Sequence, residues 1–537
     1  MKNIFDKVVG LIDPQKGLDR LKARSKLKVA EKVYSEKSRI PVKNAWEKGY
    51  SNKDDITLNS WYTQANSPDE DINESLEDLR GKSRSLYMNN TIAGAALKKY
   101  KTRVVGQGLI PKPMINYQHI GTSREEAKKI EKIIKSKFDS WANSNNSDAS
   151  RMLSFYEQQA LVVLSWVMNG DAFAIPLRKK REGVSIDLCI QLLEADRIAS
   201  PLYTDDNLIQ AGVEYDKNGQ LLAYHILSHY PNDANPYQTK RYPAFNSLGK
   251  RNIYQVFESE RIGQRRGVPI LAPIIFALKQ LGTYKDAEIS AAVVNAMVAM
   301  IIESQSKDTI GFGGGFGSGD DTLEDGNGPR ERSIGIEHSQ LIVAGEGETI
   351  REYNTQRPNK QYEAFTSALY TEIGADLEIP KDSLLSDHKS SYSAAKASME
   401  EAEKRFEVSR KILERRFCQP IYEEFILELI KNGDINCPGF FEDDSIRRAF
   451  CKCVWVGAGK VSLDPLKEAN AVGKRLKNFT TTREIEAAQH GLDFDEIVEA
   501  RKEEEMELAE IQRMVEEVNK NAEENNGEIL PDEQAGQ

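Results

Sequence analysis

The stretch over residues 261–299 constrains the fold of this chain more than any other part of its sequence. It starts with the turn-forming segment RIGQRRGVPILAP, whose glycines and prolines interrupt regular structure. It continues as a run that favours helix, with alanines recurring along part of its surface. Small side chains let helices approach closely, so we expect a helix packed inside a core or around the axis of an oligomer. The residues that define the turn are Arg261, Gly263, Gln264, Gly267, Pro269 and Pro273.

Length and charge restrict the class of protein. With 537 residues the chain is too long for one simple core, so two or more packed regions are expected. The net charge of −10 excludes a protein that binds nucleic acid mainly by neutralising phosphates. Residues 1–50 contain 13 Lys or Arg against 6 Asp or Glu, whereas residues 500–537 contain 4 against 12. Charged ends of this kind are typical of solvated arms.

Cysteine usage indicates a reducing compartment, because the five cysteines are scattered and odd in number. Cys451 and Cys453 lack the two-residue spacer of common zinc sites, so no metal site is expected. The apolar patch at residues 8–12 is followed by charges and does not predict a signal peptide. The best candidate for a membrane span, residues 289–302, is shorter than the roughly 20 apolar residues required. We therefore expect a soluble chain without a membrane partner.

Mixed helix and strand patterns in the first half predict an α+β fold. Helices are expected at 123–142, capped by Thr122 or Ser123, and at 153–168. After the second helix the period of the apolar residues shifts toward two, which indicates strands. These strands are expected at 172–176, 186–193, 209–215 and 221–227. Between the last two, residues 216–219 have the sequence of an Asn-Gly hairpin turn.

The second half predicts long helices separated by polar breaks. One helix is expected over residues 274–304, about 46 Å long at about 1.5 Å per residue. A flexible, acidic, glycine-rich loop over 305–335 follows it. The next helix is expected over 360–377, before an Ile-Pro pair. Residues 394–429 predict a very long helix that bends near Pro420.

Capping residues mark the helices nearest the C-terminus. Asp464 is expected to cap a helix that has Pro465 at its first position. The segment TTRE over residues 481–484 predicts a capping box at the start of the next helix. A charged helix follows, and a disordered acidic tail is expected from about Asn521.

Motifs for catalysis or cofactor binding are absent from the sequence, so no cofactor is expected. A P-loop ending at Gly81-Lys82-Ser83 would need a glycine where Leu76 stands. The glycine run at 311–319 precedes acidic residues that would repel phosphate, which favours a flexible loop. The acidic cluster at 320–325 lies in that loop, where metal ligands could not be held in fixed geometry. The histidines show no metal spacing, and a Gly-x-Ser-x-Gly elbow is missing.

The turn and helix over 261–299 resemble the signature of the lambda-type bacteriophage portal proteins. Four other stretches match the same family in the same order. They are residues 80–108, 209–226, 373–396 and 455–484. Together with the signature they span about residues 75–505. The chain departs from the family pattern at Ile262, where proline is frequent, and at Ala394-Ala395, where Ser-Arg is more usual.

The resemblance implies an α+β phage portal fold and a ring of about twelve subunits. The N-terminal part would comprise a basic arm (1–60), an α+β wing (60–265), a first stem helix (266–304) and a clip with a flexible Gly/Asp loop (305–356). The remainder would comprise a second stem helix (357–379), a tunnel loop (380–393), a long helix returning to the wing (394–460), a helical crown (461–520) and a disordered acidic tail (521–537).

The resemblance also implies a function without catalysis. The protein would be the portal, or head–tail connector, of a tailed phage or prophage, at one capsid vertex of the virion and in the host cytoplasm during assembly. Double-stranded DNA would pass through it during packaging and ejection. Its partners would be further copies of itself, the large terminase subunit, a head-completion or adaptor protein, and the major capsid or scaffolding protein.

The tunnel loop carries the residues expected to face DNA. These are Lys381, Ser386, His388, Lys389 and Ser390. The basic side chains Lys381, His388 and Lys389 would touch phosphates transiently, or would simply be solvated.

Two other classes of protein stay open at this point. An enzyme of DNA packaging, either the motor or a nuclease, would hydrolyse ATP or cut DNA. A cytoplasmic helical scaffold or adaptor would bind partners through its charged ends and would be a monomer or dimer in solution.

Overall fold

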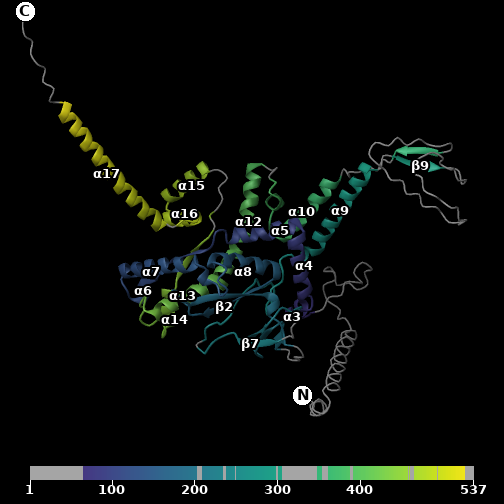
Figure 1. Ribbon diagram of the computed structural model, residues 1–537, viewed down its shortest axis with the longest axis horizontal. Coiled ribbons are helices and arrows are strands. Elements are labelled where there is room, and N and C mark those ends of the chain that lie inside the picture. Colours follow the sequence, from purple (N-terminus) through teal and green to yellow (C-terminus); the bar gives the residue numbers. More distant parts are fainter. Residues whose placement is uncertain are drawn as a thin grey trace, which may run out of the picture. The chain divides into compact units, whose positions relative to one another are not determined.

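The computed structural model describes most of the chain from residue 65 to residue 526. The described residues are 65–201, 208–233, 238–247, 249–297, 300–304, 348–352, 361–387, 391–457, 459, 465–492 and 494–526. Residues 1–66 and 67–537 form separate units, and the elements below belong to the second unit. Figure 1 shows these elements in order along the chain.

Three helices open this unit. They are α3 (Pro68–Asn73), α4 (Leu76–Asn89) and α5 (Thr91–Val104). Ser67 caps α3, and the side chain of Asn90 caps α5 by accepting hydrogen bonds from two backbone N–H groups. Gly106 and Gly108 follow α5 with positive φ angles of 61° and 128°. Glycine adopts such angles readily, so the chain turns there.

The next helices begin at capping boxes. The elements are β1 (Ile110–Pro113), α6 (Tyr117–Ile120), α7 (Arg124–Ala142), η1 (Asn145–Ser147) and α8 (Phe155–Asn169). Ser123 caps α7 and Ser154 caps α8, each in a reciprocal pair with a glutamate three residues later. Of the two predicted caps of α7, Thr122 and Ser123, Ser123 is therefore the cap. Gly170, at φ 92°, ends α8.

Antiparallel strands between residues 172 and 256 form two small sheets. In the first, β2 (Ala172–Arg178) lies between β3 (Leu188–Glu194) and β8 (Tyr254–Val256). In the second, the order is β4 (Ile209–Gln210), β5 (Val213–Tyr215), β6 (Leu221–Leu227) and β7 (Thr239–Pro243). A short turn, η2 (Ala195–Arg197), follows β3. The predicted strands and the α+β class are confirmed.

In the second sheet, one expected strand is replaced by two shorter strands. The expected strand at 209–215 is divided, because Ala211 and Gly212 both have positive φ angles, 45° and 81°. The Asn-Gly turn joins β5 and β6, and Asp216 Oδ1 accepts hydrogen bonds from the backbone N–H groups of Asn218 and Gln220.

The buried side chains of the described residues form two clusters. The larger one contains aromatic rings from α7, α8 and the C-terminal half of the chain, with Phe138 at 5.7 Å from Phe155 and 5.0 Å from Phe425 between ring centroids. The smaller cluster contains Phe173 from the three-stranded sheet and Tyr224 from the four-stranded sheet, 5.6 Å apart. The two sheets therefore share apolar contacts.

The helix after the signature turn is shorter than predicted. A short turn, η3 (Ala272–Ile274), precedes α9 (Ile275–Met297), and the strand β9 (Met300–Ser304) follows. The expectation of helix to residue 304 was wrong, because β9 pairs antiparallel with β10 (Glu348–Glu352). Ile301 and Ile302 are β-branched and suit a paired strand. The predicted acidic loop at 305–335 lies outside the described residues.

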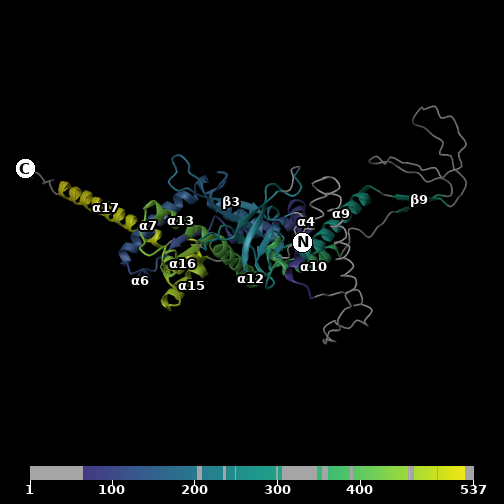
Figure 2. The ribbon, with the colours of Figure 1, turned by 90° about the horizontal axis from the view of Figure 1, so that it is seen from below.

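Further helices follow β10. They are α10 (Tyr362–Asp376), α11 (Lys381–Leu385), α12 (Tyr392–Leu413) and α13 (Gln419–Asn432). In place of one bent helix, a π-helical turn, η4 (Glu414–Cys418), separates α12 from α13. Pro420 lies in the first turn of α13, where a missing N–H is tolerated. The π-helical turn lies directly before the predicted bend near Pro420, and α12 is visible in both ribbon views (Figures 1 and 2).

The C-terminal elements are mostly helical. They are α14 (Asp444–Phe450), β11 (Cys453–Val456), which pairs with β1, and α15 (Pro465–Lys477), α16 (Arg483–Gln489) and α17 (Phe494–Asn526). The predicted capping box over residues 481–484 was wrong, because Thr482 caps α16: its Oγ1 accepts the hydrogen bond from the backbone N–H of Ile485, whose apolar side chain cannot return one. Helix also continues through Asn521, where a disordered tail was expected. The expected cap Asp464 lies outside the described residues.

Candidate functional site

A buried charge cluster lies directly behind the signature turn. Asp171 and Arg266 are 0% and 1% exposed, and the Arg266 guanidinium contacts the Asp171 carboxylate at 2.6 Å and 3.1 Å. Arg80 of α4 reaches the same carboxylate at 3.2 Å. A paired carboxylate and guanidinium can stay ionised inside a protein only if their remaining hydrogen-bonding groups are also satisfied.

Backbone carbonyls satisfy the rest of the Arg266 guanidinium. It donates to the carbonyl oxygens of Ala195 at 2.7 Å and Ile198 at 2.8 Å, and also to that of Ala211. These carbonyls belong to the segments after β3 and between β4 and β5. Arg266 therefore ties the signature turn to both sheets, and Arg80 adds α4 to the same cluster.

The positive charges of the neighbouring guanidiniums keep the buried carboxylate of this cluster ionised. Burial by itself would raise the pKa of Asp171, but the nearby guanidiniums of Arg266 and Arg80 outweigh burial and hold that pKa below its usual 3.8. Burial, followed by the like charge of Arg266, lowers the pKa of Arg80 to about 10. Asp171 and Arg80 are thus charged at neutral pH, and the cluster acts as a scaffold.

The signature turn is held by its own side chains as well. The amide oxygen of Gln264 accepts hydrogen bonds from the backbone N–H groups of Glu260 at 2.7 Å and Arg261 at 3.1 Å. Its amide nitrogen donates to the carbonyl oxygen of Arg266 at 2.8 Å. Gly263 adopts φ 83°, which glycine tolerates without strain. Gln264 therefore closes the turn around its own backbone.

Gly267 allows the turn to pass against the end of α8. A Cβ atom added at Gly267 would lie 1.9 Å from the carbonyl oxygen of Gly170. Real Cβ contacts are never so short, so the two backbones can approach only because both residues are glycine. The signature prolines follow at once: Pro269 accepts a hydrogen bond from the N–H of Ala272, and Pro273 lies in η3, which leads into α9.

Aromatic contacts pair α9 with α10. The Tyr284 ring stacks on Tyr362 with centroids 5.6 Å apart and meets Phe365 edge-on at 5.2 Å. One residue further along α9, the Lys285 ammonium lies 5.3 Å from the centroid of the Tyr370 ring. In both ribbon views α9 and α10 run side by side (Figures 1 and 2).

The corner between α10 and α12 is fixed from α5. Tyr100 donates a hydrogen bond to the carbonyl oxygen of Leu377 at 2.8 Å. The neighbouring Lys99 donates to the carbonyl oxygen of Ser383 and, at 2.9 Å, to the hydroxyl of Ser386. Ser386 has a positive φ of 56°, a conformation that costs free energy in a residue other than glycine. Contacts from α5 therefore hold both ends of this corner.

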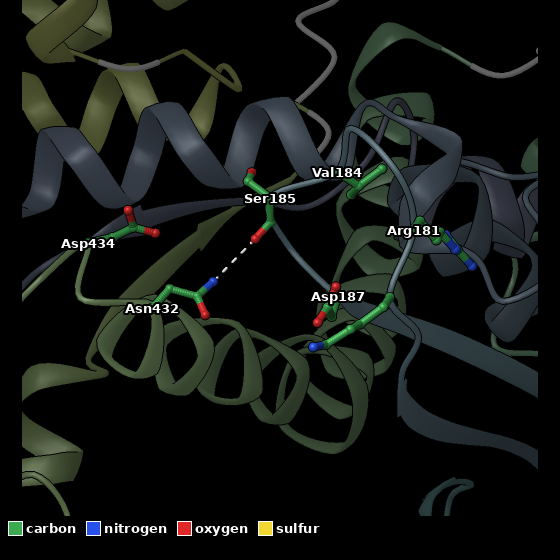
Figure 3. Close-up of a pocket in the computed structure, with 7 residues that line it drawn as sticks. Arg181, Val184, Ser185, Asp187, Asn432 and Asp434 are labelled. Carbon is green, nitrogen blue, oxygen red and sulfur yellow. Dashed lines mark hydrogen bonds between the residues drawn. The ribbon is translucent and has the colours of Figure 1, made fainter.

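Other cavities and clusters offer little chemistry. A cavity of about 540 Å³ is lined by Lys180, Arg181, Val184, Ser185, Asp187, Asn432 and Asp434 (Figure 3). There Asn432 donates to the carbonyl oxygen of Ser185 at 3.2 Å, and Arg181 donates to three backbone carbonyls. Among the described residues, no group of three or more His, Cys, Asp or Glu could hold a metal ion. Within the same residues, none of the helices combines the length and apolar character needed to cross a bilayer.

Sequence comparison adds the decisive observation. The profile of the family described as "Phage portal protein, lambda family" matches residues 55–410. This chain belongs to that family. Two curated relatives are similar over 84% of the chain: portal protein B of Escherichia phage lambda is 24% identical with 87% of its length covered, and the portal protein of Escherichia phage N15 is 22% identical with 88% covered.

Solved structures similar to this lambda-family portal protein come from necks of gene transfer agent particles. A chain from the neck of the native particle, computed with C12 symmetry, is 11% identical with a TM-score of 0.39. A chain from the neck of the empty particle, computed with C6 symmetry, is 11% identical with a TM-score of 0.40. Each comparison covers 77% of this chain and 93% of the other.

Only some of the residues predicted to face DNA lie among the described residues. In this portal-family chain Lys381 opens α11, and its ammonium hydrogen-bonds to the hydroxyl of Ser367 on α10. Ser386 ends α11 and receives the contact from Lys99. His388, Lys389 and Ser390 lie outside the described residues. The two described residues therefore both have internal partners at the base of the loop.

Sequence reasoning missed the residues that hold these segments in place. Arg266 lies inside the signature, but no structural role was predicted for it. Its position as a charged residue between two conformationally special glycines was a signal that could have indicated such a role. Asp171 and Arg80 gave no local signal, because they lie 95 and 186 positions before Arg266 along the chain. Lys99 is one of several lysines in the last turns of α5, and nothing in the sequence distinguishes it.

Proposed function

We propose that this chain is the portal, or head–tail connector, of a tailed phage or prophage. It would form a ring at one capsid vertex, through which double-stranded DNA is packaged and ejected. The observation that carries this proposal is the family match over residues 55–410. The similarity to the portal proteins of phages lambda and N15 over 84% of the chain supports it.

We carry the regional assignment of the portal proteins over to the described elements with one change. The wing would be residues 60–265, the tunnel loop 380–393 and the crown 461–520. The first stem helix would be α9, which ends at Met297, and the strand pair β9–β10 would fall in the clip. The second stem helix would be α10, and the aromatic contacts of Tyr284 support its pairing with α9.

Partners and location follow from the same role. We expect about twelve copies in the ring, a closed cyclic arrangement in which every subunit presents the same surfaces. The large terminase subunit, a head-completion or adaptor protein and the major capsid or scaffolding protein would dock on it. Assembly would take place in the host cytoplasm, and the finished ring would remain in the virion.

The proposed role requires no catalysed chemical reaction. The polar centre of the described residues, built on Asp171 and Arg266, is buried and engaged with backbone carbonyls, which suits a scaffold. The net charge of −10 per subunit would be multiplied around a ring. Excess negative charge disfavours lasting phosphate contacts, so DNA could slide through without adhering.

Negative-stain electron microscopy of the purified chain, together with its mass in solution, tests the proposal. We expect closed rings with a central hole and near twelvefold symmetry. A discrete monomer or dimer that hydrolyses ATP or cuts DNA would contradict it. A helical adaptor would give a monomer or dimer without either activity, even after the other head proteins are added.

A further inference from the structure

The helices α15, α16 and α17 are attached to the other described elements with little apolar contact. Neither hydrophobic cluster of the described residues contains a side chain from these helices. At the start of α17, Phe494, Ile497 and Val498 are only partly buried, and from Glu499 to Lys520 every residue is exposed. Burial of apolar surface is the main term that fixes one element on another, so it holds these helices only weakly.

Ion pairs of a single polarity join these helices to β1 and α7. The lysines lie on β1 and α7 and the carboxylates on α16 and α17, in the pairs Lys112–Glu484 at 2.8 Å, Lys112–Asp495 at 3.3 Å, Lys135–Glu496 at 2.7 Å and Lys132–Glu499 at 2.6 Å. The side chains of the carboxylates are 50–65% exposed. Charges that face solvent to this degree attract one another weakly and are screened by salt.

A like charge on α7 weakens this attachment further. Glu131 accepts a hydrogen bond from the backbone N–H of Ile115 at 2.7 Å. Burial raises the pKa of Glu131, and the nearby carboxylate of Asp495 raises it as well. The repulsion between the two carboxylates offsets part of the attraction that Lys112 exerts on Asp495.

A cleft separates the same helices from α12. Its volume is about 770 Å³, and it is lined by Met399 and Phe406 from α12 and by Ala471 and Ile485 from α15 and α16. Side chains on its two sides do not interlock as they do in a close-packed core. The cleft therefore leaves room for α15 and α16 to shift relative to α12.

One contact keeps α15 and α16 together, and another provides a pivot. Arg475 of α15 donates two hydrogen bonds of 2.9 Å to the carboxylate of Glu486 on α16 and one of 3.0 Å to Glu468. The turn after α16 abuts the chain after β11, because a Cβ atom added at Gly459 would lie 2.5 Å from the carbonyl oxygen of His490. A backbone contact of this kind does not depend on charge.

We propose that α15–α17 form a strap that moves off β1 and α7 about this pivot, and that ionic strength sets how often it does so. The Debye length is about 8 Å at about 0.15 M salt and about 3 Å at about 1 M salt, so the exposed pairs lose most of their attraction over that range. The apolar contacts that remain are too small to keep the strap in place. All these contacts lie within one subunit, so the strap does not depend on the proposed ring.

Charge reversal in the full-length chain, followed by hydrogen–deuterium exchange, tests the strap. In K132E/K135E two attractions become repulsions, so we expect the backbone amides of residues 494–500 to exchange about tenfold faster than in the wild-type chain. The combined variant K132E/K135E/E496K/E499K restores both pairs with the opposite polarity and should return the rate to within about twofold of wild type. K128E/K129E makes the same change of charge on two exposed lysines of α7 and is the matched control.

Thiol alkylation measures the effect of salt on the strap. Val498 is partly buried, whereas Val515 on the same helix is exposed. In V498C a neutral maleimide should react about tenfold faster at about 1 M than at about 0.15 M NaCl, whereas in V515C the two rates should agree within about twofold. Burial raises the pKa of all five native thiols, so their background reaction is slow.

Three results would overturn the strap. Exchange in K132E/K135E no faster than in K128E/K129E would show that the ion pairs do not hold α17. Fast exchange that persists in the combined variant would show that the substitutions damage α7 itself. Equal alkylation of V498C at both salt concentrations would show that α17 stays in place when its charges are screened.

Discussion

At the scale of single residues, the carboxylate of Asp171 joins more of the structure than any signature residue that the sequence suggested. Replacing it with asparagine would take away the negative charge that both buried guanidiniums, Arg80 and Arg266, contact. We expect D171N to lower the free energy of unfolding by about 3–5 kcal/mol, measured by urea unfolding followed by circular dichroism. D78N, which breaks the exposed pair with Lys82, should change it by less than about 0.5 kcal/mol.

The effect of the same substitution on stability depends on pH. Folding lowers the pKa of Asp171 below 3.8, so its ionisation stabilises the native state fully above that pH. This stabilisation is lost as the pH falls through the lowered folded-state pKa. The difference in stability between the wild-type chain and D171N should therefore be constant at neutral pH and shrink below about pH 4. An effect of D171N no larger than that of D78N would contradict the scaffold role.

At the scale of elements, two glycines that differ in the space available for a side chain provide a test substitution and its control. An added Cβ at Gly267 would collide with the backbone of Gly170, whereas one at Gly81, inside α4, meets nothing within 4 Å. We expect G267A to destabilise the chain by about 1–3 kcal/mol or more. We expect G81A to stabilise it by about 0.5–1 kcal/mol, because alanine favours helix. Thermal unfolding measures both, and a stable G267A would show that the close approach does not govern the turn.

The elements also show what sequence alone can predict. The cap of α7 was predicted to within one residue, as Thr122 or Ser123, because a capping box is formed by residues three positions apart. Ser154 caps α8 in the same way as Ser123 caps α7. The end of α9 at Met297 could not be predicted, since an Ala, Ile and Met run suits both helix and strand until a partner strand is known. For the same reason the partners of Arg266 could not be predicted: they come from distant segments, and folding alone brings them together.

At the scale of the whole molecule, the lysines of the loop over 380–393 give the clearest test of DNA passage. K381A/K389A should alter packaging or DNA retention while leaving ring formation intact, because it removes two positive charges from the proposed channel wall. The matched control is K128A/K129A, which removes two exposed lysines from α7. DNA packaged per head, measured by quantitative nuclease protection, is the readout. Unchanged packaging in K381A/K389A would reject the phosphate contact and favour simple solvation.

Lys99 and Tyr100 are neighbours in α5, yet one holds Ser383 and Ser386 while the other holds Leu377. A segment that one helix holds by hydrogen bonds at both ends cannot move independently of that helix. Mechanical load on α11 would pass into α5 and from there into the α+β region, instead of being absorbed where it is applied. In a channel that DNA is forced through, α11 would move only together with α5.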